Sequence, residues 1–565
     1  MRKIFIVLMA CWLSFFANAT QKVNESMDEL WGEHSVKQKN IGQKGDWFKQ
    51  SKYAMFVHWG LYSIPAGQWK GKNYYGITEW LMSPRVANID KVEYAKLADK
   101  FNPTDFDAQA LVQLAVDAGM KYIVITAKHH DGFAMYDSAV SDYNIVKATP
   151  YKRDPLKALA KACKEAGIGF GLYYSQYQDW YEQGSAGIAW DDSKQIYSFD
   201  EYFERKALPQ IKELMTNYGS IALIWFDTPG PMGDKYSKEI VETVKELQPN
   251  TLINSRIGNG YGDYSSLGDT HIATTNHTGL WETVDTTNNS WGYAWYDQNF
   301  KSAKKIASNL VTTIARGGNY MLNVGPTGKG VVPTTADNQL RLAGQWIAQN
   351  KEAIYGASAS PWKRALPWGD VTVKDNQLYL HVIRWPETGV ISLPGLENRV
   401  NSAYKLNTDE KIEFIQTNDK WIDFVLPNHS KKQLITIIKV TIDGSLDVDS
   451  KIKINHTGSD MLFAEFAACK GCEFKEVRWM EKFGEWVYAP SLVNWQDNSE
   501  ASWKIDVRRK GQYYIDLEYP ADEHVDYSEW MLTAGQTSLI MQAPVSEVKA
   551  GGIKLHTIKL TPITD

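Results

Sequence analysis

Cysteine is scarce in this chain, with 4 among 565 residues, so a disulfide-rich scaffold is excluded as the source of its stability. Apolar runs long enough to span a bilayer are missing too, which predicts no transmembrane segment. Neither sign of charge dominates, because 61 Lys and Arg face 66 Asp and Glu. This balance argues against nucleic acid as a partner. The motifs GxGxxG and GxxxxGK[ST] are absent at strand ends, so we expect no nucleotide cofactor.

Aromatic residues are abundant, with 22 Trp, 30 Tyr and 19 Phe. Flat rings with polar edges suit sugar faces as well as protein cores, so the count suggests a carbohydrate ligand without requiring one. Hydrophobic residues make up 44% and charged residues 22%, which predicts a globular chain with a large buried core. The length predicts several domains.

Residues 1–19 have the form of a secretory signal peptide. Positive charge at Arg2 and Lys3 precedes the apolar run 4–16, and Ala17 to Ala19 supply an A-x-A cleavage site. We expect export to the periplasm or the extracellular space. A lipoprotein anchor at Cys11 is the alternative.

Three cysteines follow the signal. In an exported protein, Cys469 and Cys472 are expected to form a local disulfide or to remain two thiols. A redox pair and half of a zinc site are weaker readings, since no second CxxC or HxxxH follows. Cys163 lies in a predicted helix and is expected to be a core residue.

Strand-like and helix-like segments alternate over residues 20–355, which predicts a (β/α)8-type barrel; a doubly wound open sheet is the alternative. The predicted strands are 53–59, 121–127, 168–175, 221–227, 251–256 and 320–324. The predicted helices are 92–101, 107–118, 156–166, 201–218, 237–247, 303–316 and 336–350. Beyond them, short alternating runs predict a β-sandwich at 356–444 and a second β-rich module at 445–565, which is either carbohydrate-binding or a packing domain.

Polar residues gather where the predicted strands end, and parallel barrels carry their chemistry at those ends. Alternation along 221–227 places Trp225 and Asp227 on one face, with the carboxylate at the rim. Other strands end at His58, at His129 and His130, at Tyr173 and Tyr174, and at Arg256. Such side chains suit a polyol substrate. A metallohydrolase is a rival reading, although the HxH spacing is missing, and we expect no metal.

A retaining glycosidase needs two carboxylates, a nucleophile and an acid/base group. Asp227 is the candidate nucleophile. Glu282 lies among apolar and aromatic neighbours, where partial desolvation raises a carboxyl pKa, so it is the predicted acid/base residue. Asp263 and Asp269 are the fallback candidates.

Six short blocks in order resemble the retaining α-L-fucosidases of glycoside hydrolase family 29. They are Met55 to Gly60, Glu79-Trp80, Lys128 to Phe133, Gly171 to Ser175, Trp225 to Asp227 and Ser290 to Tyr293, and Leu322 to Pro326 with Gly330 matches as well. The resemblance implies a barrel that holds one terminal α-L-fucose of a glycan, uses no metal and works by double displacement, with Asp227 attacking C1. The substrate-binding residues that it implies are His58, Glu79, Trp80, His129, His130, Tyr174, Trp225, Arg256 and Trp291. Of these, Trp225 and Trp291 would face the C6 methyl group.

The second carboxylate departs from part of the family, because the stretch after Arg256 contains no glutamate where some members carry one. Other members place it further along, as Glu282 would be. Two further readings stay open: an α-L-galactosidase with the same mechanism, and a catalytically silent sugar-binding protein.

Overall fold

The computed structural model describes residues 36–37, 41–185, 197–408, 410–417, 420–449, 451–455, 458–496, 498–509, 512–518, 525–534, 537–546 and 557–562. The predicted signal peptide and Cys11 lie outside these residues. The chain forms two compact units. The first contains Met1–Ser358 and Met480–Trp486, and the second contains Ala359–Trp479 and Val487–Asp565.

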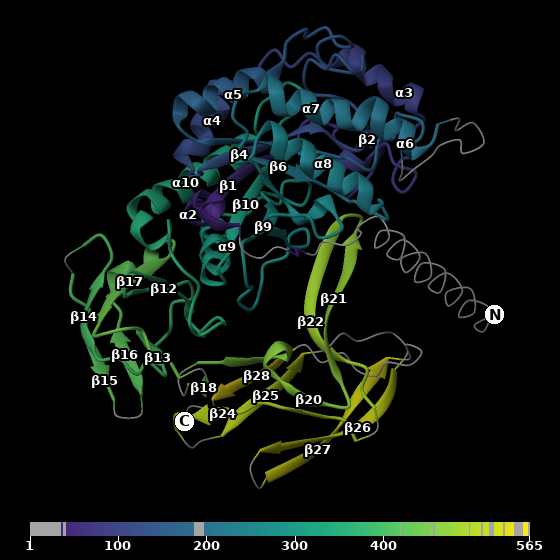
Figure 1. The fold of residues 1–565 in the computed structure, drawn as a ribbon. Helices are drawn as coiled ribbons and strands as arrows, with labels where there is room; N and C mark the ends of the chain where they lie inside the picture. Colours follow the sequence, from purple (N-terminus) through teal and green to yellow (C-terminus); the bar gives the residue numbers. More distant parts are fainter. Residues whose placement is uncertain are drawn as a thin grey trace. The chain divides into compact units, whose positions relative to one another are not determined.

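The first unit is built around an eight-stranded parallel sheet in the order β7-β6-β5-β4-β1-β10-β9-β8 (Figure 1). Its strands are β1 (Tyr53–Val57), β4 (Tyr122–Lys128), β5 (Gly169–Tyr174), β6 (Leu223–Phe226), β7 (Leu252–Ile253), β8 (Ser265–Ser266), β9 (Trp281–Thr286) and β10 (Asn319–Val324). Next to the two edge strands, Asn254 and Tyr264 form a parallel bridge. This bridge brings the ends of the sheet together, so the predicted barrel is confirmed.

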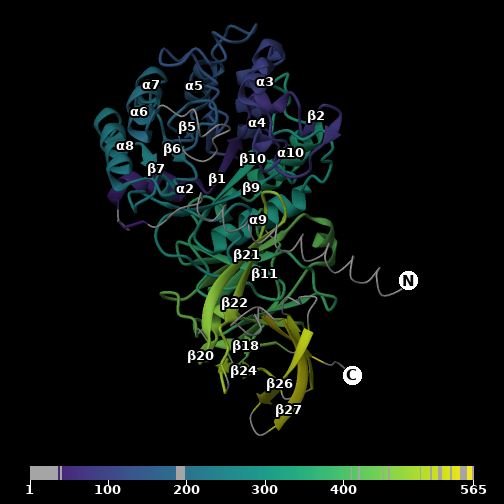
Figure 2. The same ribbon diagram turned by 90° about the vertical axis from the view of Figure 1, so that its right-hand side faces the viewer.

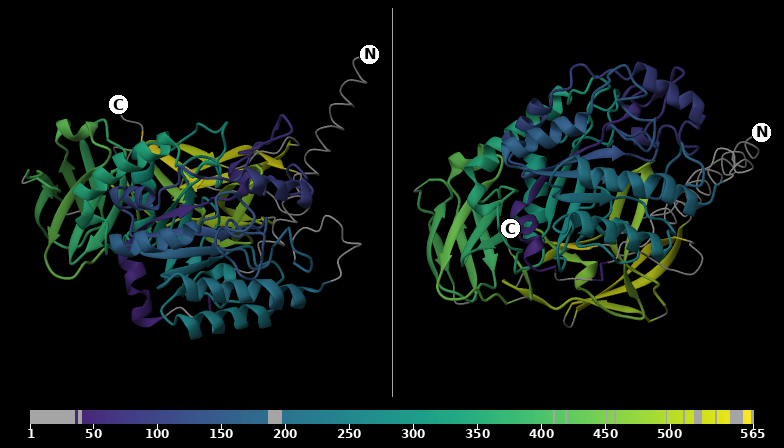
Figure 3. Two further views of the ribbon diagram at one scale, coloured as in Figure 1. Left: turned by 90° about the horizontal axis from the view of Figure 1, so that it is seen from above. Right: turned by 45° about the horizontal axis from the view of Figure 1, so that its top comes forward.

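Helices follow the strands and cover the outside of the barrel, as α5, α7 and α8 do around β5, β6 and β7 (Figure 2). The α-helices among the described residues of this unit are α2 (Asp46–Ser51), α3 (Lys91–Ala95), α4 (Ala108–Asp117), α5 (Pro155–Ala166), α6 (Phe199–Tyr202), α7 (Leu208–Asn217), α8 (Asp234–Leu247), α9 (Ala303–Ala315) and α10 (Thr334–Gln349). Figure 3 shows two long teal helices, α7 and α8, running side by side. Among the described residues, no helix is both long and apolar enough to cross a membrane.

Local chemistry explains where these helices begin and end. Asp154 precedes α5 and accepts a hydrogen bond from the backbone of Lys157, and Pro155 occupies the first helical position. Gly167 ends the helix with a φ of 69°, a left-handed conformation that glycine adopts without steric cost. The predicted helix 201–218 is continuous in the structure but contains a π-helical segment, Phe203–Ala207, between α6 and α7.

Two barrel strands, β8 and β9, were not among the predicted ones. β8 has only two residues, and β9 reads WETVDT, whose acidic residues hide the strand pattern. All six residues of β9 are nevertheless buried. A polar residue in a barrel strand can point into the interior, where it meets partners from other strands rather than solvent. Glu282 is therefore the second residue of a buried barrel strand rather than a loop residue.

The second unit begins with two antiparallel sheets around one apolar core. A four-stranded sheet has the order β11-β12-β17-β14, and a three-stranded sheet has the order β13-β16-β15. The strands are β11 (Gly369–Lys374), β12 (Gln377–Val382), β13 (Val390–Pro394), β14 (Val400–Lys405), β15 (Phe414–Gln416), β16 (Trp421–Val425) and β17 (Thr436–Ile442). Leu380, Ile391, Phe424 and Ile438 from both sheets pack in this core. The arrangement is the expected β-sandwich.

The described residues of the rest of the unit are rich in strands and have a separate apolar core that includes Ile454, Leu492 and Leu560. Its strands are β18 (Ile452–Ile454), β19 (Asp460–Phe463), β20 (Ala468–Lys470), β21 (Glu473–Lys482), β22 (Glu485–Val493), β23 (Glu500–Ser502), β24 (Ile505–Val507), β25 (Tyr513–Glu518), β26 (Val525–Ala534), β27 (Thr537–Ser546) and β28 (Thr557–Pro562). Cys469 and Cys472 are paired as a disulfide, and Cys163 in the first unit is a buried free thiol.

Candidate active site

Asp227 follows β6 directly, at the carboxyl end of the strand. Its Oδ2 accepts a hydrogen bond of 2.9 Å from the hydroxyl of Tyr173. Its Oδ1 accepts hydrogen bonds of 2.9 Å from the backbone N–H of Thr228 and 2.9 Å from Nη1 of Arg256. Three donors therefore fix the carboxylate, and its side chain keeps 12% of its surface exposed. A nucleophile needs this combination of fixed orientation and access.

Arg256 connects Asp227 to a second carboxylate. Its Nη2 lies 2.6 Å from Oδ1 of Asp269, so one guanidinium holds both aspartates. The guanidinium also lies over the ring of Trp225, 4.6 Å from its centroid. Burial lowers the pKa of Arg256, but Asp269 and then Asp227 raise it by more, so the arginine stays charged. Because Nη1 and Nη2 belong to one planar group, the two carboxylates are close neighbours.

Three histidines form one wall of the site. Nδ1 of His58 lies 2.8 Å from Oδ1 of Asn323, and the ring of His129 stacks on Tyr173 with centroids 5.2 Å apart. His130 places Nε2 3.6 Å from Oδ2 of Asp227, while its Nδ1 lies 2.7 Å from Oγ of Ser175.

Burial keeps these imidazoles neutral. It lowers the pKa of His58 to about 3 and lowers the pKa of His129 and of His130 well below the usual range. Within the described residues, Nδ1 of His129 and Nε2 of His130 are buried and have no hydrogen-bond partner. A neutral imidazole can donate from one nitrogen and accept at the other, so both rings are ready to bind substrate hydroxyl groups.

Aromatic rings and one buried carboxyl complete the surroundings. Trp291 lies 5.2 Å from His58, and Trp80 lies 5.1 Å from His130, between ring centroids. Glu79 accepts a 2.9 Å hydrogen bond from the backbone N–H of Gly292, and burial raises its pKa to about 8. At neutral pH this carboxyl group is largely protonated and can donate a hydrogen bond.

Tyr174, the tyrosine predicted for substrate binding, faces away from Asp227. Its hydroxyl donates a 2.9 Å hydrogen bond to Gln210, whereas Tyr173 reaches the carboxylate. Tyr173 pairs in register with Trp225 on the neighbouring strand. The alternation of faces that places Trp225 and Asp227 together also places Tyr173 of the neighbouring strand β5 on their side, so the same argument predicts Tyr173 rather than Tyr174.

Glu282, the predicted acid/base residue, lies at the start of β9, away from the carboxyl end of the barrel. Its Oε1 accepts a 2.7 Å hydrogen bond from Nε1 of Trp225, and the residue is 0% exposed. Burial raises the pKa of Glu282 to about 7, as predicted for a desolvated carboxyl group, but no surface of this group is open to a substrate.

The two fallback carboxylates differ in their places. Asp263 accepts from the backbone N–H of Ile253 and pairs with Lys44, 3.1 Å away, so it joins the barrel to the N-terminal segment. Asp269 shares Arg256 with Asp227 and keeps 17% of its side chain exposed. Of the three acidic candidates, Asp269 is the one that the structure brings to Asp227.

The sequence-based site omitted two amides. Asn323 places Oδ1 2.8 Å from Nδ1 of His58, and its Nδ2 donates a 2.7 Å hydrogen bond to the carbonyl oxygen of Trp291. Gln176 accepts from the backbone N–H of Asp227 at 3.1 Å and donates to the carbonyl oxygen of Arg256 at 2.9 Å. Both follow or end a barrel strand, as the other rim residues do, so their position in the sequence is the signal that could have identified them.

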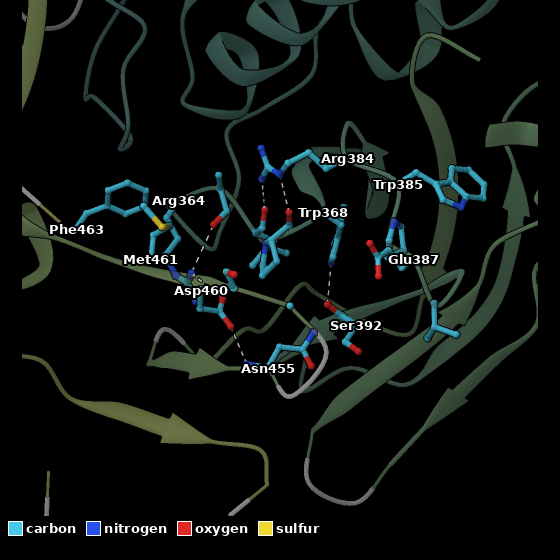
Figure 4. Close-up of a pocket in the computed structure, with 17 residues that line it drawn as sticks. Arg364, Trp368, Arg384, Trp385, Glu387, Ser392, Asn455, Asp460, Met461 and Phe463 are labelled. Carbon is cyan, nitrogen blue, oxygen red and sulfur yellow. Dashed lines mark hydrogen bonds and ion pairs between the residues drawn. The ribbon is translucent and has the colours of Figure 1, made fainter. Parts of the chain in front are cut away.

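Metal ligation has no geometric support in the part of the chain that the structure describes, where no group of three or more His, Cys, Asp or Glu is placed to hold an ion. A separate cavity of about 570 Å³ lies within the second unit and contains no barrel residue (Figure 4). Both of its arginines are engaged by protein atoms: Arg384 donates to the carbonyl oxygens of Leu366 and Pro367, and Arg364 lies 3.7 Å from Asp460. This cavity supplies no catalytic pair.

Two carboxylates held by one arginine at the carboxyl rim of a (β/α)8 barrel, with histidine and aromatic walls, define the site of a glycoside hydrolase. The model of the α-L-fucosidase family matches residues 17–352, so the chain belongs to the α-L-fucosidase family.

Individual relatives agree with this assignment. The rat tissue α-L-fucosidase is 30% identical over 387 residues, which cover 64% of this chain and 80% of the relative. The crystal structure of an α-L-fucosidase from Vibrio sp. strain EJY3 has a TM-score of 0.77 at 28% identity, covering 94% of this chain and 95% of that one. A Lactobacillus casei α-L-fucosidase in complex with α-L-fucose is 44% identical with a TM-score of 0.52, covering 55% of this chain and all of the other.

Proposed function

We propose that this protein is an exo-acting retaining α-L-fucosidase, with Asp227 as the nucleophile and Asp269 as the acid/base residue. The observation that carries the proposal is the double engagement of Arg256, whose Nη1 binds Asp227 and whose Nη2 binds Asp269. A retaining enzyme needs its two carboxyl groups close together, about 5 to 5.5 Å apart, and the shared guanidinium makes Asp227 and Asp269 close neighbours.

In the first step, an oxygen of Asp227 attacks C1 of the fucosyl residue and the bond from C1 to the leaving oxygen breaks. Protonated Asp269 gives its proton to that oxygen, and a β-linked glycosyl ester forms. In the second step, Asp269 as a carboxylate takes a proton from water, and the water oxygen attacks C1. Asp227 leaves as a carboxylate, and fucose is released with its α configuration retained.

Asp269 replaces Glu282 in this role because of access. A general acid must reach the leaving oxygen directly or through one water molecule. Glu282 is fully buried against Trp225 inside the barrel, whereas Asp269 is partly exposed beside the nucleophile. The raised pKa of Glu282 then reflects a buried structural carboxyl group.

The neutral histidine wall supplies the specificity for a polyol. The unpartnered nitrogens of His129 and His130 and the protonated carboxyl of Glu79 would bind hydroxyl groups of the sugar. Trp291 and Trp225 would offer apolar surface to the C6 methyl group, which separates fucose from galactose. Fucose-bearing oligosaccharides or polysaccharides are the proposed substrates. The N-terminal segment 1–19 supports export, with cleavage after Ala19.

The test uses an aryl α-L-fucoside with added azide and compares Asp227→Ala, Asp269→Ala and Glu282→Gln. The wild type should release fucose first as the α-anomer, as NMR would detect. Azide should rescue Asp269→Ala by attacking the β-linked intermediate, which gives α-fucosyl azide. In Asp227→Ala, azide should attack the substrate directly and give β-fucosyl azide. If azide instead rescued Glu282→Gln with formation of α-fucosyl azide, and did not change the turnover of Asp269→Ala, the acid/base role would belong to Glu282.

A further inference from the structure

The tip of the hairpin formed by β21 and β22 belongs to the first unit, although it lies far from the barrel in sequence (Figure 1). This tip, Met480–Trp486, makes backbone contacts with the barrel loops. The carbonyl oxygen of Phe483 accepts a 3.2 Å hydrogen bond from the N–H of Ile77. The approach is close, since a Cβ at Gly76 would lie 2.5 Å from that oxygen.

Phe483 extends the aromatic wall of the site. Its ring centroid lies 5.5 Å from Trp80, and Trp80 lies 5.1 Å from His130, which contacts Asp227. Phe483 is therefore one ring further from the nucleophile than Trp80, and it is partly exposed. A sugar bound at Asp227 would have Trp80 as its neighbour, and Phe483 would meet what is attached to that sugar.

The tip also reaches the acid/base side. The hydroxyl of Thr270, the residue after Asp269, donates a 3.2 Å hydrogen bond to the carbonyl oxygen of Trp486. An acid/base residue stands beside the leaving oxygen, so a segment bound next to it lies on the leaving-group side.

A small cavity of about 210 Å³ lies beside the tip. Lys482 and Glu485 line it from the hairpin. Tyr75, Gly76, Asn289, Tyr296, Asp297, Gln298 and Asn299 line it from the barrel loops. Tyr75 and Tyr296 form an edge-to-face pair with centroids 4.9 Å apart, so the cavity combines aromatic rings with hydrogen-bonding groups of both kinds.

We propose that the hairpin tip Met480–Trp486 binds the sugar that serves as the leaving group, with Phe483 as its apolar platform and Lys482 and Glu485 as polar contacts. This proposal depends on the proposed function. It assigns to the tip the choice between glycans with different sugars next to fucose, while Asp227 and the histidines bind fucose itself.

The experiment compares two substrates that share fucose and differ in the leaving group. The first is the fucosyl disaccharide that the wild type hydrolyses best among the α-1,2, α-1,3, α-1,4 and α-1,6 isomers, and the second is α-L-fucosyl fluoride. The selectivity, defined as the ratio of the two kcat/KM values, should fall about three- to tenfold in Phe483→Ala, because an aromatic contact with a sugar is lost. Phe483→Tyr keeps the ring and should restore most of the ratio.

Phe474 on the same strand β21 gives the matched control, since it is an aromatic residue 49% exposed and outside the tip. Phe474→Ala should leave the ratio at the wild-type value. An unchanged ratio in Phe483→Ala would overturn the proposal, and so would equal losses on both substrates, because those indicate an effect through Trp80 or through folding. No turnover of the fluoride by the wild type would overturn the proposed function itself, and this proposal with it.

Discussion

Trp225 donates a hydrogen bond from its indole nitrogen to Oε1 of Glu282 at 2.7 Å, across the interior of the barrel. The guanidinium of Arg256 lies over the ring of the same Trp225, with Cζ 4.6 Å from the ring centroid. Arg256 in turn holds Asp227 and Asp269. A buried carboxyl group thus binds the ring over which Arg256 lies, and this contact fixes the position of Trp225.

A structural role for Glu282 predicts how stability depends on pH. Burial raises its pKa to about 7 in the folded chain, above the ordinary value of 4.5. Between these values the folded state keeps a proton that the unfolded state has lost, so stability falls as pH rises. The loss from this group is about 3 kcal/mol above pH 7. Glu282→Gln stays neutral and should avoid that loss.

Thermal unfolding measures this effect. At pH 4.5 the melting temperatures of Glu282→Gln and the wild type should agree closely, and by pH 8 the variant should gain a few degrees relative to the wild type. Glu93→Gln provides the control, because Glu93 is 39% exposed and pairs with Lys70 at the surface. A difference that stays constant with pH would contradict the buried, protonated state of Glu282.

Tyr173 and Tyr174 offer adjacent residues with opposite orientations. Tyr173→Phe removes the hydrogen bond to Asp227, so kcat on an aryl fucoside should fall about tenfold to a hundredfold, as expected for a bond to a charged group. Tyr174→Phe removes the bond to Gln210 and should change kcat less than about threefold. Steady-state kinetics decides, and a larger loss in Tyr174→Phe would return the substrate role to that residue.

Asp227→Asn should lower kcat/KM on an aryl fucoside by at least about 10³-fold, because an amide cannot form the glycosyl ester. Asp263→Asn is the matched aspartate, whose partners are the backbone of Ile253 and Lys44. It should retain activity within a few-fold. Mass spectrometry after a 2-fluoro-fucosyl fluoride trap should find the label on the peptide that contains Asp227. A label elsewhere would refute the nucleophile assignment.

Asp179 lies between two buried lysines, 3.0 Å from Nζ of Lys128 and 2.9 Å from Nζ of Lys206. Asp179→Asn would remove the ion pair of buried Lys128 and leave Lys206 with its longer 3.5 Å pair to Glu182, so we expect a loss of about 3 to 5 kcal/mol in the free energy of unfolding. Asp142→Asn is the control, since Asp142 is 90% exposed in its pair with Lys147 and should cost less than about 1 kcal/mol. Denaturant unfolding measures the free energy of unfolding of both variants. Equal losses in Asp179→Asn and Asp142→Asn would contradict the prediction that the buried ion pairs contribute more than the exposed one.

Most barrel strands were predictable because their apolar residues repeat in short runs that local sequence displays. The run Ile221 to Phe226 ends in Asp227, and the alternation of faces alone places that carboxylate at the rim. β9 was not predictable in this way, because Glu282 and Asp285 interrupt its apolar pattern. Their hydrogen-bond donors include Trp225 for Glu282 and Tyr320, at 2.7 Å, for Asp285. Such partners lie on other strands, so no window of sequence contains them.

The amino-acid sequence by itself determined the alternating architecture, the ordered rim motifs and the nucleophile candidate, because each depends on residues close together in the chain. Only the tertiary structure decided which acidic residue joins Asp227. The sequence favoured Glu282 and kept Asp269 as a fallback, but Arg256 holds Asp269 beside Asp227, while the start of β9 buries Glu282 against Trp225. The physical reason is that a carboxyl group acts through distance and access, and the folding of the barrel sets both.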